Sequence, residues 1–149
     1  MFRGNHPAKV DEKGRLKLPA AFKQLLDAEG TARFYITSTD GSSAEIWPLS
    51  EWEARETKLA DYSMDEAVQR YINVTSYYGQ QVETDTQARL LLPQILRGKA
   101  SLNTDVVVLG KMKYLEVVNR ENFESSLATN ELTAENRKSL ATILQPKAQ

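Results

Sequence analysis

Apolar and polar residues alternate in two short stretches near the start of the chain, residues 8–10 and 16–18. Between them lies a polar Asp-Glu-Lys-Gly segment, residues 11–14, whose composition is typical of a turn. Alternation of this kind places the apolar side chains on one face of an extended strand. The pattern therefore predicts a β-hairpin with a charged tip.

A helix is predicted directly after this hairpin. Pro19 suits the first turn of a helix, because the missing proline N–H costs nothing there. The apolar residues that follow at i, i+3 and i+4 are predicted to form its buried stripe: Phe22, Leu25 and Leu26. Gly30 ends the helix. Two strands are then expected, at residues 33–37 and 44–47, around the turn Asp40-Gly41-Ser42.

The chain contains an internal repeat. Asp, Arg, Leu and Pro occur in the same order in residues 11–19 and 85–93, at a constant offset of 74 residues. A second block, residues 45–52, matches residues 116–123 at an offset of 71. Preserved order over two blocks favours a duplication. The two strands of the first copy are accordingly expected again at residues 105–109 and 114–118.

Two helices are predicted between the copies. Ser50–Glu53 and Ser63–Glu66 both fit the S-x-x-E capping box that begins many helices. An amphipathic stripe follows the second box: Met64, Ala67, Val68, Tyr71 and Ile72. We interpret this pair as a linker that seats one copy against the other, with Trp52, Tyr71 and Ile72 as a surface for subunit packing. Leu132, Leu140, Ile143 and Leu144 allow one more helix before a polar tail, residues 145–149, that is expected to fray.

The composition argues against an enzyme. The 149 residues suffice for one ordinary domain, and the absence of cysteine excludes disulfides, thiolate metal sites and cysteine nucleophiles. The single histidine, His6, lies too near the N-terminus to anchor a catalytic triad or a metal site. No cofactor or metal is therefore expected. No apolar stretch approaches the roughly 20 residues that span a bilayer, and no secretory leader is visible, so we expect a cytoplasmic protein.

Charge is distributed unevenly along a chain whose net charge is only −1. Residues 6–23 hold five basic residues against two acidic ones, a local net charge of +3. The equivalent segment of the second copy, residues 80–97, has two of each and is neutral. Acidic residues instead crowd into residues 45–66, where a solvated helical face is expected. Any binding of anions should therefore be local to the first copy.

These segments resemble a known family. The chain begins Met-Phe-Arg-Gly, carries D-E-K-G-R-L-K-L-P at residues 11–19 and W-P-L-S-E-W at residues 47–52, and repeats D-x-x-x-R at residues 85–89. Together these motifs resemble the MraZ family of bacterial transcriptional regulators, over residues 1 to about 125. The resemblance implies a mainly β, α+β fold: a duplicated SpoVT/AbrB-like, swapped-hairpin (double-split) β-barrel with packed helices. Its copies would be residues 1–76, with a core of about 5–53, and residues 77–149, with a core of about 80–125.

The same resemblance implies a function. Such proteins form ring-shaped homo-oligomers on the nucleoid and bind double-stranded DNA at direct-repeat promoter boxes. The boxes lie upstream of the division and cell-wall gene cluster, which includes the regulator's own gene. The family's D-x-x-x-R positions carry over to Asp11 and Arg15 and to Asp85 and Arg89. The second copy departs from the family pattern with Ala88 in place of glycine and without a preceding lysine.

The residues themselves support a DNA-binding tip. Arg15 follows Gly14 at the tip, where its guanidinium can contact a guanine or a phosphate, or instead pair with Asp11. Asp11 and Asp85 are expected to structure the turns, because a carboxylate facing DNA is repelled. The candidate DNA-binding residues are Arg15, Lys13, Lys17, Lys9, Gly14, Arg3 and Arg89.

Several of these assignments leave alternatives open. Lys9 and Lys17 are either DNA contacts or solvated strand residues, and Arg3 lies with His6 on an N-terminal arm. Arg89 is expected mainly to pair with Asp85 or with a neighbouring subunit, so that the first hairpin reads DNA and the second completes the barrel. An alternative function is a protein-interaction module of antitoxin or scaffold type without specific DNA binding.

Overall fold

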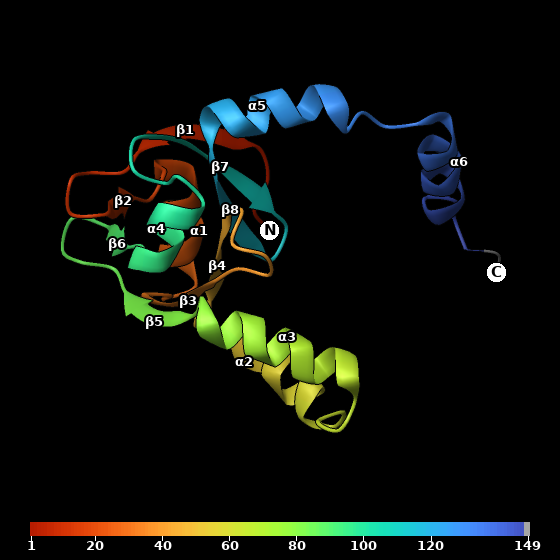
Figure 1. The fold of residues 1–149 in the computed structure, drawn as a ribbon, viewed down its shortest axis with the longest axis horizontal. Helices are drawn as coiled ribbons and strands as arrows, with labels where there is room; N and C mark the ends of the chain where they lie inside the picture. The colour runs from red at the N-terminus through yellow and green to blue at the C-terminus, as the bar shows by residue number, and fades with distance from the viewer. Residues whose placement is uncertain (148–149) are drawn as a thin grey trace.

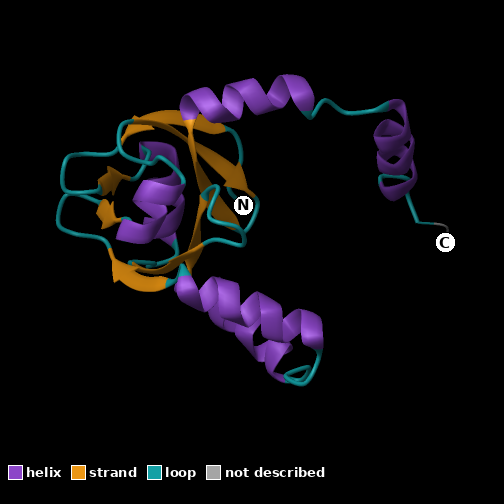
Figure 2. Cartoon of the chain, in the orientation of Figure 1, coloured by secondary structure: helices purple, strands orange, loops and turns teal. Residues whose placement is uncertain are grey.

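The computed structural model describes residues 1–147 and confirms the duplication (Figures 1 and 2). Both copies contain strand, strand, helix, strand, strand and helix in the same order. The first copy comprises β1 Asn5–Lys9, β2 Arg15–Lys17, α1 Ala20–Ala28, β3 Arg33–Thr37, β4 Ala44–Pro48 and α2 Leu49–Ala60. After α3 Glu66–Tyr77, the second comprises β5 Gln80–Glu83, β6 Arg89–Leu91, α4 Gln94–Lys99, β7 Asp105–Lys111, β8 Tyr114–Asn119 and α5 Arg120–Thr129. The helix α6 Ala134–Ile143 follows the second copy.

The strands form an antiparallel arrangement that is symmetric between the copies. One sheet has the order β1-β7-β8-β4-β3-β5, and β2 pairs with β6 in a separate ladder. Exchanging each strand for its equivalent in the other copy reproduces the same order. Equivalent residues also face each other at the centre of two ladders, Leu16 opposite Leu90 and Glu45 opposite Glu116. The copies are therefore related by a pseudo-two-fold axis through these pairs.

The predicted hairpin of residues 8–10 and 16–18 does not form as a paired ladder. β1 pairs instead with β7, and β2 with β6, so each strand finds its partner in the other copy. A single bridge, Val10 to Leu16, is what remains of pairing between the two segments within residues 1–147. A two-stranded hairpin cannot cover its own apolar face. Exchange of strands buries that face in a core shared by both copies, so interleaved copies were correctly predicted although the local pairing was wrong.

The shared core draws on the strands of both copies and on α1 and α4, which Figure 1 shows in the middle of the body. Phe22 and Leu26 of α1 are buried, as predicted, and Leu96 of α4 is their counterpart. Leu25 is 41% exposed, so its assignment to the buried stripe was wrong. The short helix offers only one side to the core, and Leu25 lies beyond its edge. Gly30 has a φ of +69° just after the helix, as its role as a helix stop requires.

The helices α2 and α3 exist, but neither begins at its predicted capping box. α2 begins at Leu49 directly after Pro48, and α3 is capped by Asp65, whose carboxylate accepts hydrogen bonds from the N–H groups of Ala67 and Val68. Met64 lies outside the helix and is exposed. Figure 1 shows the pair projecting away from the body, so it does not seat one copy against the other. The exchanged strands do so instead.

The predicted packing surface on these helices is largely satisfied within the chain. Trp52 of α2 is buried and stacks on Tyr35 with 4.7 Å between ring centroids. Tyr71 of α3 stacks on Trp52 at 6.3 Å, whereas Ile72 is 42% exposed. The segment of residues 45–66 is also not uniformly solvated, because Glu45 is buried on β4.

The chain after α5 extends away from the body (Figure 1). α6 confirms the additional helix predicted from the leucine and isoleucine spacing. None of its residues is buried, and Ile143 and Leu144 are both more than 70% exposed. Of the tail expected to fray, residues 148 and 149 lie outside the described residues. Over residues 1–147, no helix is long and apolar enough to cross a membrane.

Candidate nucleic-acid interface

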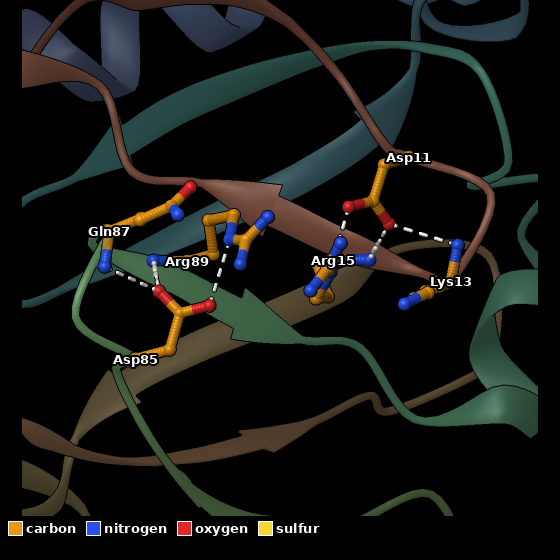
Figure 3. A network of polar contacts seen from close by, with 6 residues as sticks. All are labelled: Asp11, Lys13, Arg15, Asp85, Gln87 and Arg89. Atoms are coloured by element: carbon orange, nitrogen blue, oxygen red, sulfur yellow. Dashed lines mark hydrogen bonds and ion pairs between the residues drawn. The ribbon is translucent and has the colours of Figure 1, made fainter.

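The first Asp-x-x-x-Arg segment forms a compact loop between β1 and β2 (Figure 3). Oδ1 of Asp11 accepts hydrogen bonds from the backbone N–H groups of Lys13, at 3.0 Å, and Arg15, at 2.8 Å. Oδ2 of the same carboxylate accepts a hydrogen bond from Nε of Arg15 at 2.8 Å. Asp11 therefore structures the turn, as expected, and also orients the Arg15 side chain.

The second loop reproduces this network almost atom for atom (Figure 3). Oδ1 of Asp85 accepts from the backbone N–H groups of Gln87 and Arg89, both at 2.9 Å. Oδ2 accepts from Nε of Arg89 at 2.8 Å. The expected pairing of Arg89 with Asp85 is present, and the alternative pairing of Arg15 with Asp11 is present as well.

The backbones of the two loops are matched and joined to each other. Gly14 has a φ of +84° and Ala88 a φ of +60°, so both occupy the left-handed region. The carbonyl of Ala88 accepts a hydrogen bond from the N–H of Leu18 at 3.0 Å, and the carbonyl of Gly14 accepts one from Leu92 at 2.9 Å. Each loop therefore supports the strand that leaves the other. The loss of glycine at Ala88 did not change the fold of the loop.

Both aspartates remain charged under ordinary conditions. The hydrogen bond from the backbone N–H of Arg15 is the largest cause that holds the pKa of Asp11 below its usual value, and the Arg15 side chain adds to it. The pKa of Asp85 is lowered in the same way by the N–H and side chain of Arg89. Both carboxylates are thus charged near neutral pH, and their protonation, which weakens these contacts, requires a lower pH than that of an ordinary aspartate.

The β2–β6 ladder places three cationic side chains on one outward surface. Leu16 and Leu90 face each other and are fully buried, so their strand neighbours point the other way. On that outward side Lys17 lies opposite Arg89, and Arg15 lies opposite Leu91. The ion pairs engage Nε of each arginine, and in residues 1–147 no hydrogen bond occupies the terminal nitrogens of Arg15 or Arg89. Those nitrogens can contact a phosphate or a base edge.

The other candidate residues lie at different distances from this surface. Lys13 is exposed at the tip of the first loop, and Lys9 lies at the end of β1 that enters the loop, opposite Asp105. Arg3 lies at the other end of β1, about 20 Å from Lys9 at the rise of an extended strand. The N-terminus is also not a free arm, because His6 is in β1 and packs edge-on against Phe22. The structure thus groups Lys13, Gly14, Arg15, Lys17 and Arg89, with Lys9 at the margin, and leaves Arg3 outside.

One cation at the first loop was missed by the sequence reasoning. Arg97 of α4 packs against Gly14, and a β-carbon added to Gly14 would overlap its Nη1, Cζ and Cδ atoms. Arg97 belongs to the second copy and is far from Gly14 along the chain. Only the missing side chain at Gly14 hinted that something approaches the loop closely. In the described part of the chain as a whole, no cluster of three or more histidine, aspartate or glutamate side chains could hold a metal ion.

Comparison with known proteins gives a consistent result. The family described as MraZ protein, antitoxin-like, matches residues 1–75 and 79–143. A transcriptional regulator MraZ of Acidobacterium capsulatum is 54% identical over 142 residues, which cover 95% of this chain and 97% of that protein. Regulators of the same name from Koribacter versatilis and Thiobacillus denitrificans are 43% and 32% identical, over 96% and 86% of this chain and 99% and 87% of their own lengths. These relatives carry the name of a regulator and not of an enzyme.

Proposed function

The chain belongs to the MraZ family of transcriptional regulators, and from this premise we propose that it binds specific double-stranded DNA through the β2–β6 ladder and its two loops. The proposed targets are direct-repeat promoter boxes upstream of the division and cell-wall gene cluster, including the chain's own gene. We place it in the cytoplasm, associated with the nucleoid. The proposed units are residues 1–76 and 77–149, each a SpoVT/AbrB-like repeat.

The observation that carries this proposal is the outward surface of the β2–β6 ladder. A two-stranded β-ribbon fits the major groove of B-DNA, where arginine can pair bidentately with guanine. Here Asp11 holds Arg15 by Nε at 2.8 Å, which fixes the guanidinium and leaves its terminal nitrogens for the DNA. Lys13 and Lys17 flank Arg15 and add the positive charge that attracts phosphates. A structural ion pair alone would not require these lysines.

The alternative of a protein-interaction module is weakened by the second half of the chain. An antitoxin of this type would end in a long disordered arm that wraps its toxin. Residues 80–129 instead fold as a second copy that shares the core with the first. Within residues 1–147, the segment that follows the second copy contains the helix α6.

The small basic footprint implies that DNA is bound by several subunits at once. One protomer offers only some four to six cationic side chains, which supports weak binding at physiological salt. A ring-shaped homo-oligomer larger than a dimer, engaging several phased boxes, would raise the affinity by roughly 10²–10⁴-fold through effective concentration. Light scattering should therefore give a mass well above that of a dimer, and a mass of 16.8 kDa at micromolar concentration would contradict the ring.

The decisive test compares DNA fragments from upstream of the chain's own gene. Fluorescence anisotropy at a fixed salt concentration should show tight binding to the fragment that carries all its boxes. It should show roughly 10²–10⁴-fold weaker binding when all boxes but one are scrambled. A scrambled fragment of equal length is the control. Equal binding to all three fragments would contradict specific recognition, and equal binding to one box and several would contradict the multivalent mechanism.

A further inference from the structure

The contact between Arg97 and the first loop joins the two copies at the proposed DNA surface. Arg97 extends from α4 of the second copy and lies against Gly14 of the first, in space that a side chain at Gly14 would occupy. The loop carbonyl of Gly14 is meanwhile held by the N–H of Leu92, two residues before α4 begins. The base of α4 and the first loop are therefore fixed relative to each other.

Among residues 1–147, no carboxylate forms an ion pair with Arg97. In the part of the chain that the structure describes, its guanidinium forms no ion pair, and its Nε is buried without a hydrogen-bond partner. Arg15 and Arg89, by contrast, each pair with an aspartate of their own loop. The positive charge around the first loop that no ion pair within residues 1–147 compensates thus comes from Lys13, Lys17 and Arg97 rather than from Arg15. A buried, unpaired donor costs free energy in the unbound protein and calls for an explanation.

The second loop lacks both halves of this arrangement. The equivalent of Gly14 is Ala88, which carries a methyl side chain in the same left-handed backbone conformation. The equivalent of Arg97 is Lys23 of α1, and its ammonium pairs with Asp27 one helical turn further on. The glycine and the free arginine therefore occur together at one loop, and the alanine and the paired lysine occur together at the other. This match argues that the space at Gly14 serves Arg97.

We propose that Arg97 contacts a phosphate of the DNA backbone beside the first loop, so that the second copy supplies a positioning contact to the recognition loop of the first. This inference rests on the proposed DNA binding. Guanidinium is well suited to this role because it forms paired hydrogen bonds with phosphate oxygens. A phosphate contact adds affinity and sets the register of the protein on DNA without reading the base sequence.

The test measures the affinity for a single-box duplex at several salt concentrations. Arg97→Gln should weaken binding roughly threefold to tenfold and reduce the slope of log K against log salt by about 0.9. Lys23→Gln is the matched control at the equivalent position and should leave both quantities unchanged. The loss should be similar for specific and scrambled duplexes, because a phosphate contact carries no sequence information. Light scattering and thermal denaturation confirm that the variants keep their assembly and fold.

A double-mutant cycle keeps the test decisive if Arg97→Gln also perturbs the fold. Gly14→Ala should displace the Arg97 side chain. The loss of DNA affinity caused by Gly14→Ala should therefore be smaller in the Arg97→Gln protein than in the wild type. Additive effects, or equal losses from Arg97→Gln and Lys23→Gln, would overturn the role of Arg97 while wild-type binding leaves the proposed function standing. Failure of the wild-type protein to bind the duplex at any salt concentration would overturn both.

Discussion

The loops at residues 11–18 and 85–92 have the same geometry but different chemistry. Each is held by an aspartate that accepts two backbone N–H groups and the Nε of an arginine, at distances that agree within 0.1 Å. They differ in side chains that make none of these hydrogen bonds: Lys13 is Gln87 in the second loop, Lys17 is Leu91, and Gly14 is Ala88. The turn and the proposed DNA-binding surface are therefore separable, because one set of residues builds the loop and another supplies its positive charge.

This comparison changes the role expected for Arg89. The arginine pairs with Asp85 as expected, yet it also lies opposite Lys17 on the outward side of the ladder. Its position is thus shared with the first loop, and only the remainder of its own loop lacks cations, with Gln87 at the position of Lys13. A division of labour between the loops must come from Lys13 and Arg97, not from the placement of the two arginines.

The largest expected effect separates these arginines. Arg15→Ala should cost about 1–3 kcal/mol of specific DNA binding per engaged site, which is roughly fivefold to 150-fold in affinity. Arg89→Ala should cost less DNA affinity, because fewer cations accompany Arg89. Both substitutions remove the same hydrogen bond to an aspartate, so they should lower the melting temperature by similar amounts. Anisotropy and thermal denaturation measure the two effects, and light scattering shows whether the assembly is kept. Equal losses of DNA affinity in intact assemblies would contradict the division of labour.

A smaller effect tests whether charge alone distinguishes the loops. Lys13→Gln should reduce the slope of log K against log salt by about 0.9 for the phosphate contact that is lost. Gln87→Lys should raise it by a similar amount, because the backbone of the second loop already has the required geometry. Titrations at several salt concentrations compare the reciprocal variants. If Gln87→Lys leaves the slope unchanged, the second loop lies away from the DNA and position, not charge, separates the loops.

The comparison of the two loop backbones predicts that one substitution in the second loop raises the stability of the fold by a small amount. Ala88 has a φ of +60°, a conformation that costs a residue with a side chain about 1 kcal/mol relative to glycine. Ala88→Gly should therefore raise the melting temperature by about 2–4 °C. Gly14→Ala should lower it by more, because the methyl group would also meet Arg97. A fall in melting temperature for Ala88→Gly would show that the second loop is not strained.

Local patterns predicted most of the elements, because each depends on neighbours within a few residues. The spacing of apolar residues and the position of glycine and proline predicted the strands at residues 33–37 and 44–47 and the helix after Pro19. The start of α3 was misplaced because Ser63 and Asp65 both offer a capping oxygen, and only the folded chain shows that Asp65 is used. The pairing of β1 with β7 could not be predicted from neighbouring residues, since it depends on how two copies cover each other's apolar faces.

In the candidate site, too, local contacts could be predicted from the sequence and contacts between distant residues could not. The Asp-x-x-x-Arg loops were predictable because their hydrogen bonds join residues two to four positions apart. Arg97 was not, because it reaches Gly14 from another copy through a contact with no sequence signature. Glu45 was assigned to a solvated acidic segment, but it is buried on β4 and accepts a hydrogen bond from Nε1 of Trp47. Burial of a charged residue is a property of the packing around it, which the segment itself does not show.

The smallest effect concerns a second pair of equivalent residues, Glu45 and Glu116, which face each other across the pseudo-two-fold axis. Glu45 is 8% exposed and accepts a hydrogen bond from Nε1 of Trp47 at 2.8 Å. Burial raises the pKa of Glu45, and the nearby Glu116 raises it further, although the Trp47 hydrogen bond opposes both. Glu116 instead lies within 3.6 Å of Nζ of Lys111 and accepts a hydrogen bond from Ser43 at 2.9 Å.

Because its pKa is higher in the folded than in the unfolded protein, Glu45 favours the folded state less as the pH rises from about 4.5 through that higher value. Glu45→Gln keeps an acceptor for Trp47 and removes the charge, so its melting temperature should decline less than that of the wild type between pH 4.5 and about pH 8. Glu116→Gln is the matched comparison and should flatten the profile less, because it removes only the contribution of Glu116 to the raised pKa of Glu45 and leaves burial, the largest cause, in place. Thermal denaturation across this range measures both variants. Parallel pH profiles for Glu45→Gln and the wild type would show that the buried carboxylate is solvated as well as its equivalent, and that the pseudo-two-fold axis is symmetric in its electrostatics as well as in its backbone.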